Sequence, residues 1–86
     1  MQFLVESRFN QAPTDEMMAL IPAEQARGKE LDAAGSRLAL YIAADFSAGW
    51  QVYQAESLSA VQEMIDSFPL TRFTTTTITL LQSAAI

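Results

Sequence analysis

Residues 73–81, FTTTTITLL, form the stretch that decides the fold. Six consecutive positions in it, Thr74 to Thr79, carry β-branched side chains, which favour strands because they pack well on a pleated surface. A second strand pattern lies at the start of the chain, where residues 2–9 alternate with the period of two that is typical of a strand. We therefore expect strands near both ends of the chain.

A helix is expected after the first strand. Thr14 is followed by two acidic residues, which is the pattern of an N-cap and a first turn that the helix dipole stabilises. The helical pattern runs to about Ala34, and Gly35 is a natural helix end. Pro22 lies inside this span, so either the helix kinks near Met18 or a short first turn is followed by a second helix with Pro22 at its first position.

A hairpin and a second helix are expected between that glycine and the last strand. Residues 37–44 and 50–54 read as two strands around a short turn, and Ser57 then caps a helix that Pro69 ends. The apolar stripe predicted for this helix consists of Leu58, Val61, Ile65 and Phe68.

The order βαββαβ predicts a single α+β domain over residues 1–86, with the ferredoxin-like plan of an antiparallel sheet and two helices on one face. A sheet covered on one side should alternate apolar and polar residues. These strands instead carry apolar residues on both faces, Leu4 and Tyr41 among them. We therefore expect a second copy of the chain to cover the other face, in a homodimer or a larger homo-oligomer, with room for a cavity between the sheets.

The composition excludes much chemistry. The chain has 5 basic and 10 acidic residues, and it has neither Cys nor His, so thiol and imidazole catalysis, zinc fingers and disulfides are excluded. We expect no metal site and no cofactor. The dispersed basic residues predict no nucleic-acid partner, and the lack of a signal peptide or a long apolar segment predicts a cytoplasmic protein without a membrane partner.

Glu24 is the strongest candidate for a catalytic residue. On a continuous helix it falls within the same apolar stripe as Met17, Ile21 and Leu31. Burial would raise the pKa of its carboxyl toward the range of a useful general base. The alternatives are that Glu24 lies at the helix edge, that Pro22 turns it outward, or that it pairs with an arginine.

Further candidates lie on the strands. Glu6 and Arg8 share one face of the first strand, where Glu6 could take a proton and Arg8 could hold a substrate carboxylate; an intersubunit or cross-strand salt bridge is the structural alternative. Arg37 is placed on the same strand face as Tyr41, and Tyr53 on the same face as Gln51. Tyrosine hydroxyls in a pocket can stabilise an enolate, although packing is their commoner role.

The chain resembles the muconolactone delta-isomerase family over residues 1 to about 81. The resemblance rests on the opening MQFLVES, on Glu24 eleven residues before Gly35, on Tyr41, on WQVYQAES (50–57) and on FPLTRF (68–73). It implies a dimeric α+β barrel without cofactor, and an isomerase that moves a proton on a small lactone or organic acid through a dienolate-like intermediate.

Two functions are therefore compatible with the sequence. In the first, Glu24 or Glu6 moves the proton, Arg8 or Arg37 holds the substrate carboxylate, and Tyr41 or Tyr53 lines the pocket. In the second, the same barrel is a non-catalytic oligomeric module that binds a small ligand or only assembles. The fold alone does not separate them.

Overall fold

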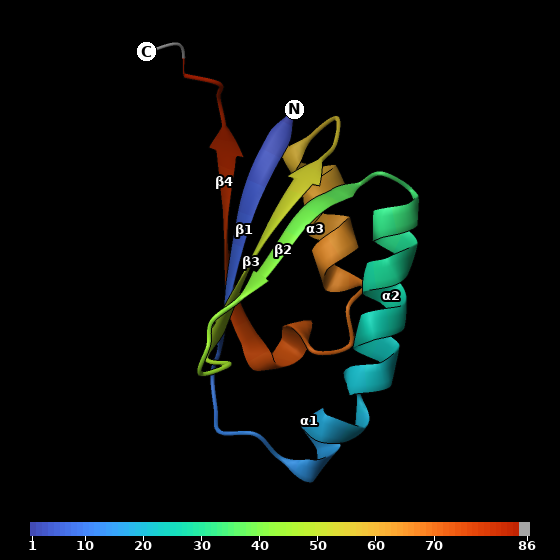
Figure 1. The fold of residues 1–86 in the computed structure, drawn as a ribbon, viewed down its shortest axis with the longest axis vertical. Helices are drawn as coiled ribbons and strands as arrows, with labels where there is room; N and C mark the ends of the chain where they lie inside the picture. Colours follow the sequence, from blue (N-terminus) through green and yellow to red (C-terminus); the bar gives the residue numbers. More distant parts are fainter. Residues whose placement is uncertain (85–86) are drawn as a thin grey trace.

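The structure is a computed structural model, and it describes residues 1–84. A four-stranded antiparallel sheet, in the order β2-β3-β1-β4, is covered by helices on one side (Figure 1). The α+β class and the βαββαβ order are thereby confirmed. The elements are β1 (Gln2–Phe9), α1 (Asp15–Ala19), α2 (Ile21–Ala33), β2 (Arg37–Ile42), β3 (Ala48–Gln54), α3 (Leu58–Asp66), the 3-10 helix η1 (Thr71–Phe73) and β4 (Thr74–Leu81).

The helix expected over residues 14–34 is divided at Leu20 into α1 and α2. The Thr14 hydroxyl accepts a hydrogen bond from the Met17 N–H at 3.2 Å, as expected of an N-cap. Pro22 lies in the first turn of α2, where its missing N–H breaks no helical hydrogen bond. The second of the two alternatives for Pro22 is therefore correct. Gly35 follows α2 with a φ of +75°, which is the left-handed conformation predicted for it.

The hydrophobic core lies between the sheet and helices α2 and α3. Phe3, Val5 and Tyr53 contribute from the strands, and Leu31 contributes from α2. Three of the four stripe residues predicted for α3 belong to this core, namely Val61, Ile65 and Phe68. The prediction was wrong for Leu58, which is 56% exposed because it is the first residue of α3 and lies one turn before the buried stripe begins.

The sheet has two faces, which the register defines. We call the helix-covered side the inner face; it carries Phe3 and Val5 of β1, together with Tyr53 and Gln51, their partners on β3. The opposite side is called the open face, because no described helix covers it (Figure 1). It carries the alternate residues Leu4, Glu6 and Arg8 of β1, Val52 and Trp50 of β3, and Thr75, Thr77 and Thr79 of β4.

A β-bulge in β2 changes the predicted placement of Arg37. Arg37 pairs with Tyr53, whereas Ala39 pairs with Val52, so the register shifts by one residue at Leu38. Because one residue of shift exchanges the faces, Arg37 lies on the inner face and Tyr41, opposite Trp50, lies on the open face. The prediction that Arg37 shares a face with Tyr41 was therefore wrong.

The hairpin between β2 and β3 turns earlier than the sequence suggested. Strand β3 begins at Ala48, inside the turn expected over residues 45–49. Asp45 stabilises the turn by accepting hydrogen bonds from the Ser47 N–H (3.0 Å) and hydroxyl (2.6 Å). These bonds hold the pKa of the Asp45 carboxyl below its usual value. Phe46 has a φ of +62°, which is unusual for a residue other than glycine.

Candidate functional site

The six predicted site residues fall into two groups on opposite sides of the sheet. The open face carries Glu6, Arg8 and Tyr41. The layer between the sheet and α2 contains the other group, Glu24, Arg37 and Tyr53. Since the sheet separates the two groups, one molecule of the protein cannot use both groups on the same small ligand.

Glu24 lies in the first turn of α2 and is half-buried. Its Oε1 accepts a hydrogen bond from the Leu70 N–H at 2.9 Å, which links α2 to the segment between α3 and η1. Burial raises the pKa of the Glu24 carboxyl above 4.5, and the bond from Leu70 and the charge of Arg37 reduce this effect without cancelling it. A carboxyl with a raised pKa is better suited to accept a proton near neutral pH than an exposed one.

Arg37 is held firmly between β2 and α2. Its Nε and Nη2 donate to the two carboxylate oxygens of Asp32, at 2.7 and 3.1 Å, and its Nη1 donates to Gln51 Oε1 at 3.1 Å. Its side chain is only 9% exposed. The paired guanidinium lowers the pKa of Asp32, and the same bonds raise the pKa of Arg37. The guanidinium therefore faces the protein interior, and its N–H groups that point toward Asp32 and Gln51 are already hydrogen-bonded.

Tyr53 completes this cluster from the neighbouring strand. Its side chain is 0% exposed, and its hydroxyl donates to Gln51 Oε1 at 2.6 Å. Burial raises the pKa of the Tyr53 hydroxyl well above its usual range. Gln51 therefore accepts from both Arg37 and Tyr53, a role that the sequence did not assign to it. The strand period could have indicated this role, because Gln51 stands two residues before Tyr53 and therefore lies on the same strand face.

The open-face group is a surface network centred on Glu6. Its Oε1 accepts from the Trp50 Nε1–H at 2.9 Å and from Arg8 Nη2 at 3.3 Å. The Arg8 guanidinium lies 5.9 Å from the centre of the Trp50 ring, which is within cation–π range. Glu6 and Arg8 thus form a salt bridge within β1, whereas the structural alternative expected from the sequence was an intersubunit or cross-strand salt bridge. Tyr41 is 67% exposed.

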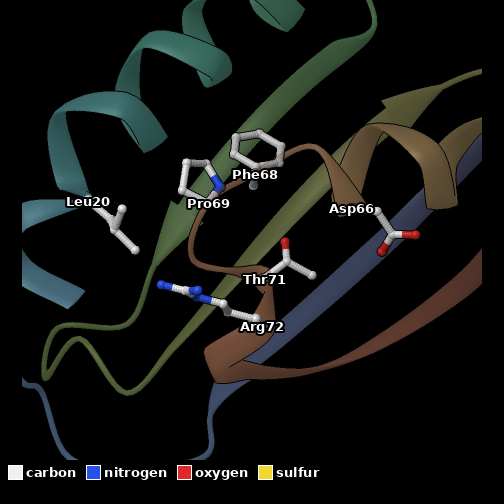
Figure 2. A pocket seen from close by; sticks show the side chains of 6 residues that line it. All are labelled: Leu20, Asp66, Phe68, Pro69, Thr71 and Arg72. Atoms are coloured by element: carbon white, nitrogen blue, oxygen red, sulfur yellow. The ribbon is translucent and has the colours of Figure 1, made fainter. Parts of the chain in front are cut away.

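An open hollow of about 600 Å³ lies where the start of α2 approaches the segment between α3 and η1, and Glu24 is not one of its lining residues (Figure 2). Leu20 lines it, and the Leu20 carbonyl accepts from the Glu24 N–H at 2.9 Å. Leu70, which donates to the Glu24 carboxylate, stands between two further lining residues. The other lining residues are Asp66, Phe68, Pro69, Thr71 and Arg72. Arg72 also pairs with Glu16 of α1 at 2.7 Å and lies 4.7 Å from the Phe73 ring centre, so the hollow carries one arginine at its wall.

Within residues 1–84, no three carboxylates come together as a group that could bind a metal ion. In the same part of the chain, no helix has the length and apolar character needed to cross a membrane.

Comparisons with known proteins agree with this fold. The sequence profile of the muconolactone delta-isomerase family matches residues 1–84, so the chain belongs to that family. No curated protein sequence matches it significantly.

Two solved structures are similar to it. A crystal structure of muconolactone isomerase superposes with a TM-score of 0.83 at 20% identity, covering 98% of this chain and 91% of that one. The 5-chloro-2-hydroxyhydroquinone dehydrochlorinase TftG of Burkholderia phenoliruptrix AC1100, in complex with 2,5-dihydroxybenzoquinone, superposes with a TM-score of 0.80 at 16% identity, covering 98% and 96%. At such identities the likeness shows the fold, and the muconolactone-isomerase-like fold predicted from the sequence is confirmed.

Proposed function

We propose that the protein is a cofactor-independent isomerase that moves a proton on a small, anionic lactone or organic acid. The observation that carries the proposal is the environment of Glu24. Its pKa is raised by burial, whereas the pKa values of Asp32 and Asp45 are lowered by their hydrogen-bond partners. A general base needs a pKa shifted toward the working pH, and Glu24 has that shift. Membership of the muconolactone delta-isomerase family supports this type of reaction.

The proposed step is a proton transfer between two carbons. The Glu24 carboxylate takes a proton from an acidic C–H of the substrate, and the electron pair of that bond delocalises onto the carbonyl oxygen as a dienolate. The protonated Glu24 then returns the proton to a different carbon, so that no atoms are gained or lost. The Leu70 N–H fixes Oε1 at 2.9 Å, which leaves Oε2 as the oxygen that accepts the proton.

The hollow is the proposed substrate site, and Glu24, which binds the Leu70 N–H between two of its lining residues, is proposed to reach the substrate there. The apolar residues of the hollow, Leu20, Phe68 and Pro69, fit the carbon skeleton of a small ring, and a substrate carboxylate is proposed to bind Arg72 at its wall in competition with Glu16. Substrate contacts by Arg37 and Tyr53 stay predictions that require the buried layer to open. Substrate contacts by Arg8 and Tyr41 also stay predictions, because they require a ligand bound at the open face between two copies of the chain.

The test is the Glu24→Gln variant with Glu30→Gln as its matched control. Both residues lie on α2, but Glu30 is exposed and pairs with Arg27 at 2.8 Å. We expect Glu24→Gln to stay folded and to lower turnover of a muconolactone-type lactone about a hundredfold or more, whereas Glu30→Gln keeps full turnover. A folded Glu24→Gln protein with wild-type turnover would contradict the proposal.

A specific observation also favours the non-catalytic alternative. Arg37, Gln51 and Tyr53 satisfy one another, and within residues 1–84 no buried side-chain nitrogen or oxygen lacks a partner. Such a cluster fits a purely structural role. In that case Glu24→Gln changes stability by about 1 to 3 kcal/mol, and the wild-type protein has no lactone turnover above the uncatalysed rate.

A further inference from the structure

Three residues of α2 form a row above Arg37. Glu24, Gly28 and Asp32 are spaced by four, so they follow one another along one face of the helix, with about 5 to 6 Å between neighbouring positions. A carboxylate stands at each end of this row, and the residue between them has no side chain. The guanidinium of Arg37 lies under the middle of the row.

Gly28 provides the space that Arg37 occupies. A Cβ atom at this position would lie 2.5 Å from Arg37 Nη2, 3.0 Å from Cζ and 3.1 Å from Nη1. These distances are shorter than normal packing contacts, so any larger residue would force the guanidinium to move. Glycine is required here because the Arg37 guanidinium approaches the helix closely. Its backbone conformation is not the reason, since Gly28 lies within the regular helix α2.

The partners of Arg37 fix it at this place. Asp32 binds it through two hydrogen bonds and Gln51 through a third, and its side chain is 9% exposed. A guanidinium held by two oxygens of one carboxylate keeps a defined plane, which a flexible surface arginine does not. Its positive charge therefore stands at a constant position one helical turn from Glu24.

We propose that Arg37 is a positioning residue for Glu24: held by Asp32 and Gln51 in the gap at Gly28, its fixed charge keeps the half-buried Glu24 carboxylate ionised and ready to accept a proton. The catalytic part of this proposal rests on the proposed function. The effect of the Arg37 charge on Glu24 does not, because it needs no substrate.

The groups around Glu24 agree with this role. From β2, the charge of Arg37 lowers the pKa of Glu24 and so opposes the effect of burial. From β3, Tyr53 is close enough for the charge of Glu24 to act on its hydroxyl. The segment after α3 contributes the Leu70 N–H, and α2 itself contributes Asp32 on the far side of the guanidinium. Arg37 is the positively charged residue among these groups.

The experiment is an NMR titration of the Glu24 side-chain carboxyl in the intact protein, with and without Arg37. Arg37→Gln removes the charge, and we expect the Glu24 pKa to rise by about one, a tenfold increase in proton affinity. Arg37→Lys keeps the charge, and we expect a pKa nearer to the wild-type value. The control is Lys29→Gln, which removes an exposed positive charge from the same helix and leaves the Glu24 pKa in place. An unchanged pKa in Arg37→Gln, or an equal rise in Arg37→Lys and Arg37→Gln, would overturn the proposal.

A second variant tests the gap and covers the case in which Arg37→Gln does not fold. Gly28→Ala keeps every charge but displaces the guanidinium, so it should raise the Glu24 pKa by a smaller amount; no change would overturn the role of the gap. The acid limb of the pH profile of kcat/KM should move to higher pH with the same variants. Failure of the proposed function would appear separately, as unchanged turnover in Glu24→Gln, and would leave the titration result standing.

Discussion

The two faces of the sheet differ in how their polar residues are used. On the inner face, Arg37 binds Asp32 of α2 and Gln51 of β3, the buried Tyr53 binds Gln51 of its own strand, and Glu24 lies on α2 above them. On the open face, Glu6 and Arg8 form a partly exposed network around Trp50. Burial raises the pKa of Glu24 and of Tyr53, because charge is costly where water is scarce. The inner layer is therefore the place to look for acid–base chemistry.

The open face shows a different property. It combines partly exposed apolar side chains, such as Leu4 and Tyr41, with a small charged network. That mixture is typical of a surface that covers another protein surface, with an apolar centre and polar contacts. We therefore expect chemistry on the inner face and assembly on the open face, and each expectation can be tested by matched substitutions on β1 and its neighbours.

The largest expected difference between the faces is in core packing. Phe3 is buried against α2 and α3, whereas the adjacent Leu4 points to the open face. Phe3→Ala should lower the free energy of unfolding by about 3 to 5 kcal/mol, which is enough to unfold a domain of this size, whereas Leu4→Ala should cost about 1 kcal/mol or less within one copy. Chemical denaturation at one fixed protein concentration measures both. Equal costs would mean that Leu4 is as deeply packed as Phe3.

The next effect concerns assembly through the open face. We expect a homodimer, or a larger multiple, in which the open faces meet, so Tyr41→Asp or Leu4→Asp should give a monomer or an insoluble protein. Met18→Asp is the control, because Met18 is an exposed apolar residue of α1 on the other side of the molecule. Sedimentation of the wild-type chain at micromolar concentration as a single 9.4 kDa species would contradict assembly altogether.

A smaller effect distinguishes the two tyrosines. Tyr53→Phe removes the hydroxyl that donates to Gln51 at 2.6 Å, and because Arg37 still donates to Gln51 the loss should be about 1 kcal/mol. This corresponds to a decrease in Tm of about 4 to 8 °C for a domain of this length. Tyr41→Phe should leave Tm unchanged. A decrease for Tyr41→Phe alone would reverse the roles that burial gives to the two residues.

The smallest expected effect is the pH dependence of stability. The pKa of Glu24 is higher in the folded chain, so its stabilising contribution is present below its ordinary pKa of 4.5 and is lost as the pH rises through the folded value. Asp32 has a lowered pKa, so its contribution is present above its ordinary value of 3.8 and is lost as the pH falls through the folded one. Wild type should thus lose stability relative to Glu24→Gln as the pH rises past 4.5. Thermal unfolding at several pH values measures this difference, and parallel curves would show that Glu24 is solvated.

Much of the fold was predictable because short-range rules determine it. Thr14 and Ser57 cap helices, Gly35 ends one, and the β-branched run of β4 specifies a strand. The placement of Arg37 was not predictable, because the bulge at Leu38 carries no glycine or other local signal in the sequence. The bulge is visible only in how β2 pairs with β3.

The candidate site was predicted in part. Helical periodicity placed Glu24 against the protein, and the structure finds it half-buried with a raised pKa. Periodicity could not show that Leu70 would bind its carboxylate, because that contact joins residues 46 positions apart. The same row of α2 contains Asp32, eight residues after Glu24, but its pairing with Arg37 depends on the bulge in β2. Contacts between distant segments therefore account for most of what the sequence did not show.

The most direct test compares the two carboxylates that the sequence offered as proton carriers. Glu24 lies in the inner layer and Glu6 lies on the open face, so Glu24→Gln and Glu6→Gln should be assayed side by side for turnover of a muconolactone-type lactone, with the folded fraction of each measured by circular dichroism. We predict a loss of about a hundredfold or more for Glu24→Gln and a change of less than about threefold for Glu6→Gln. A large loss confined to Glu6→Gln would place the chemistry on the open face and contradict the account.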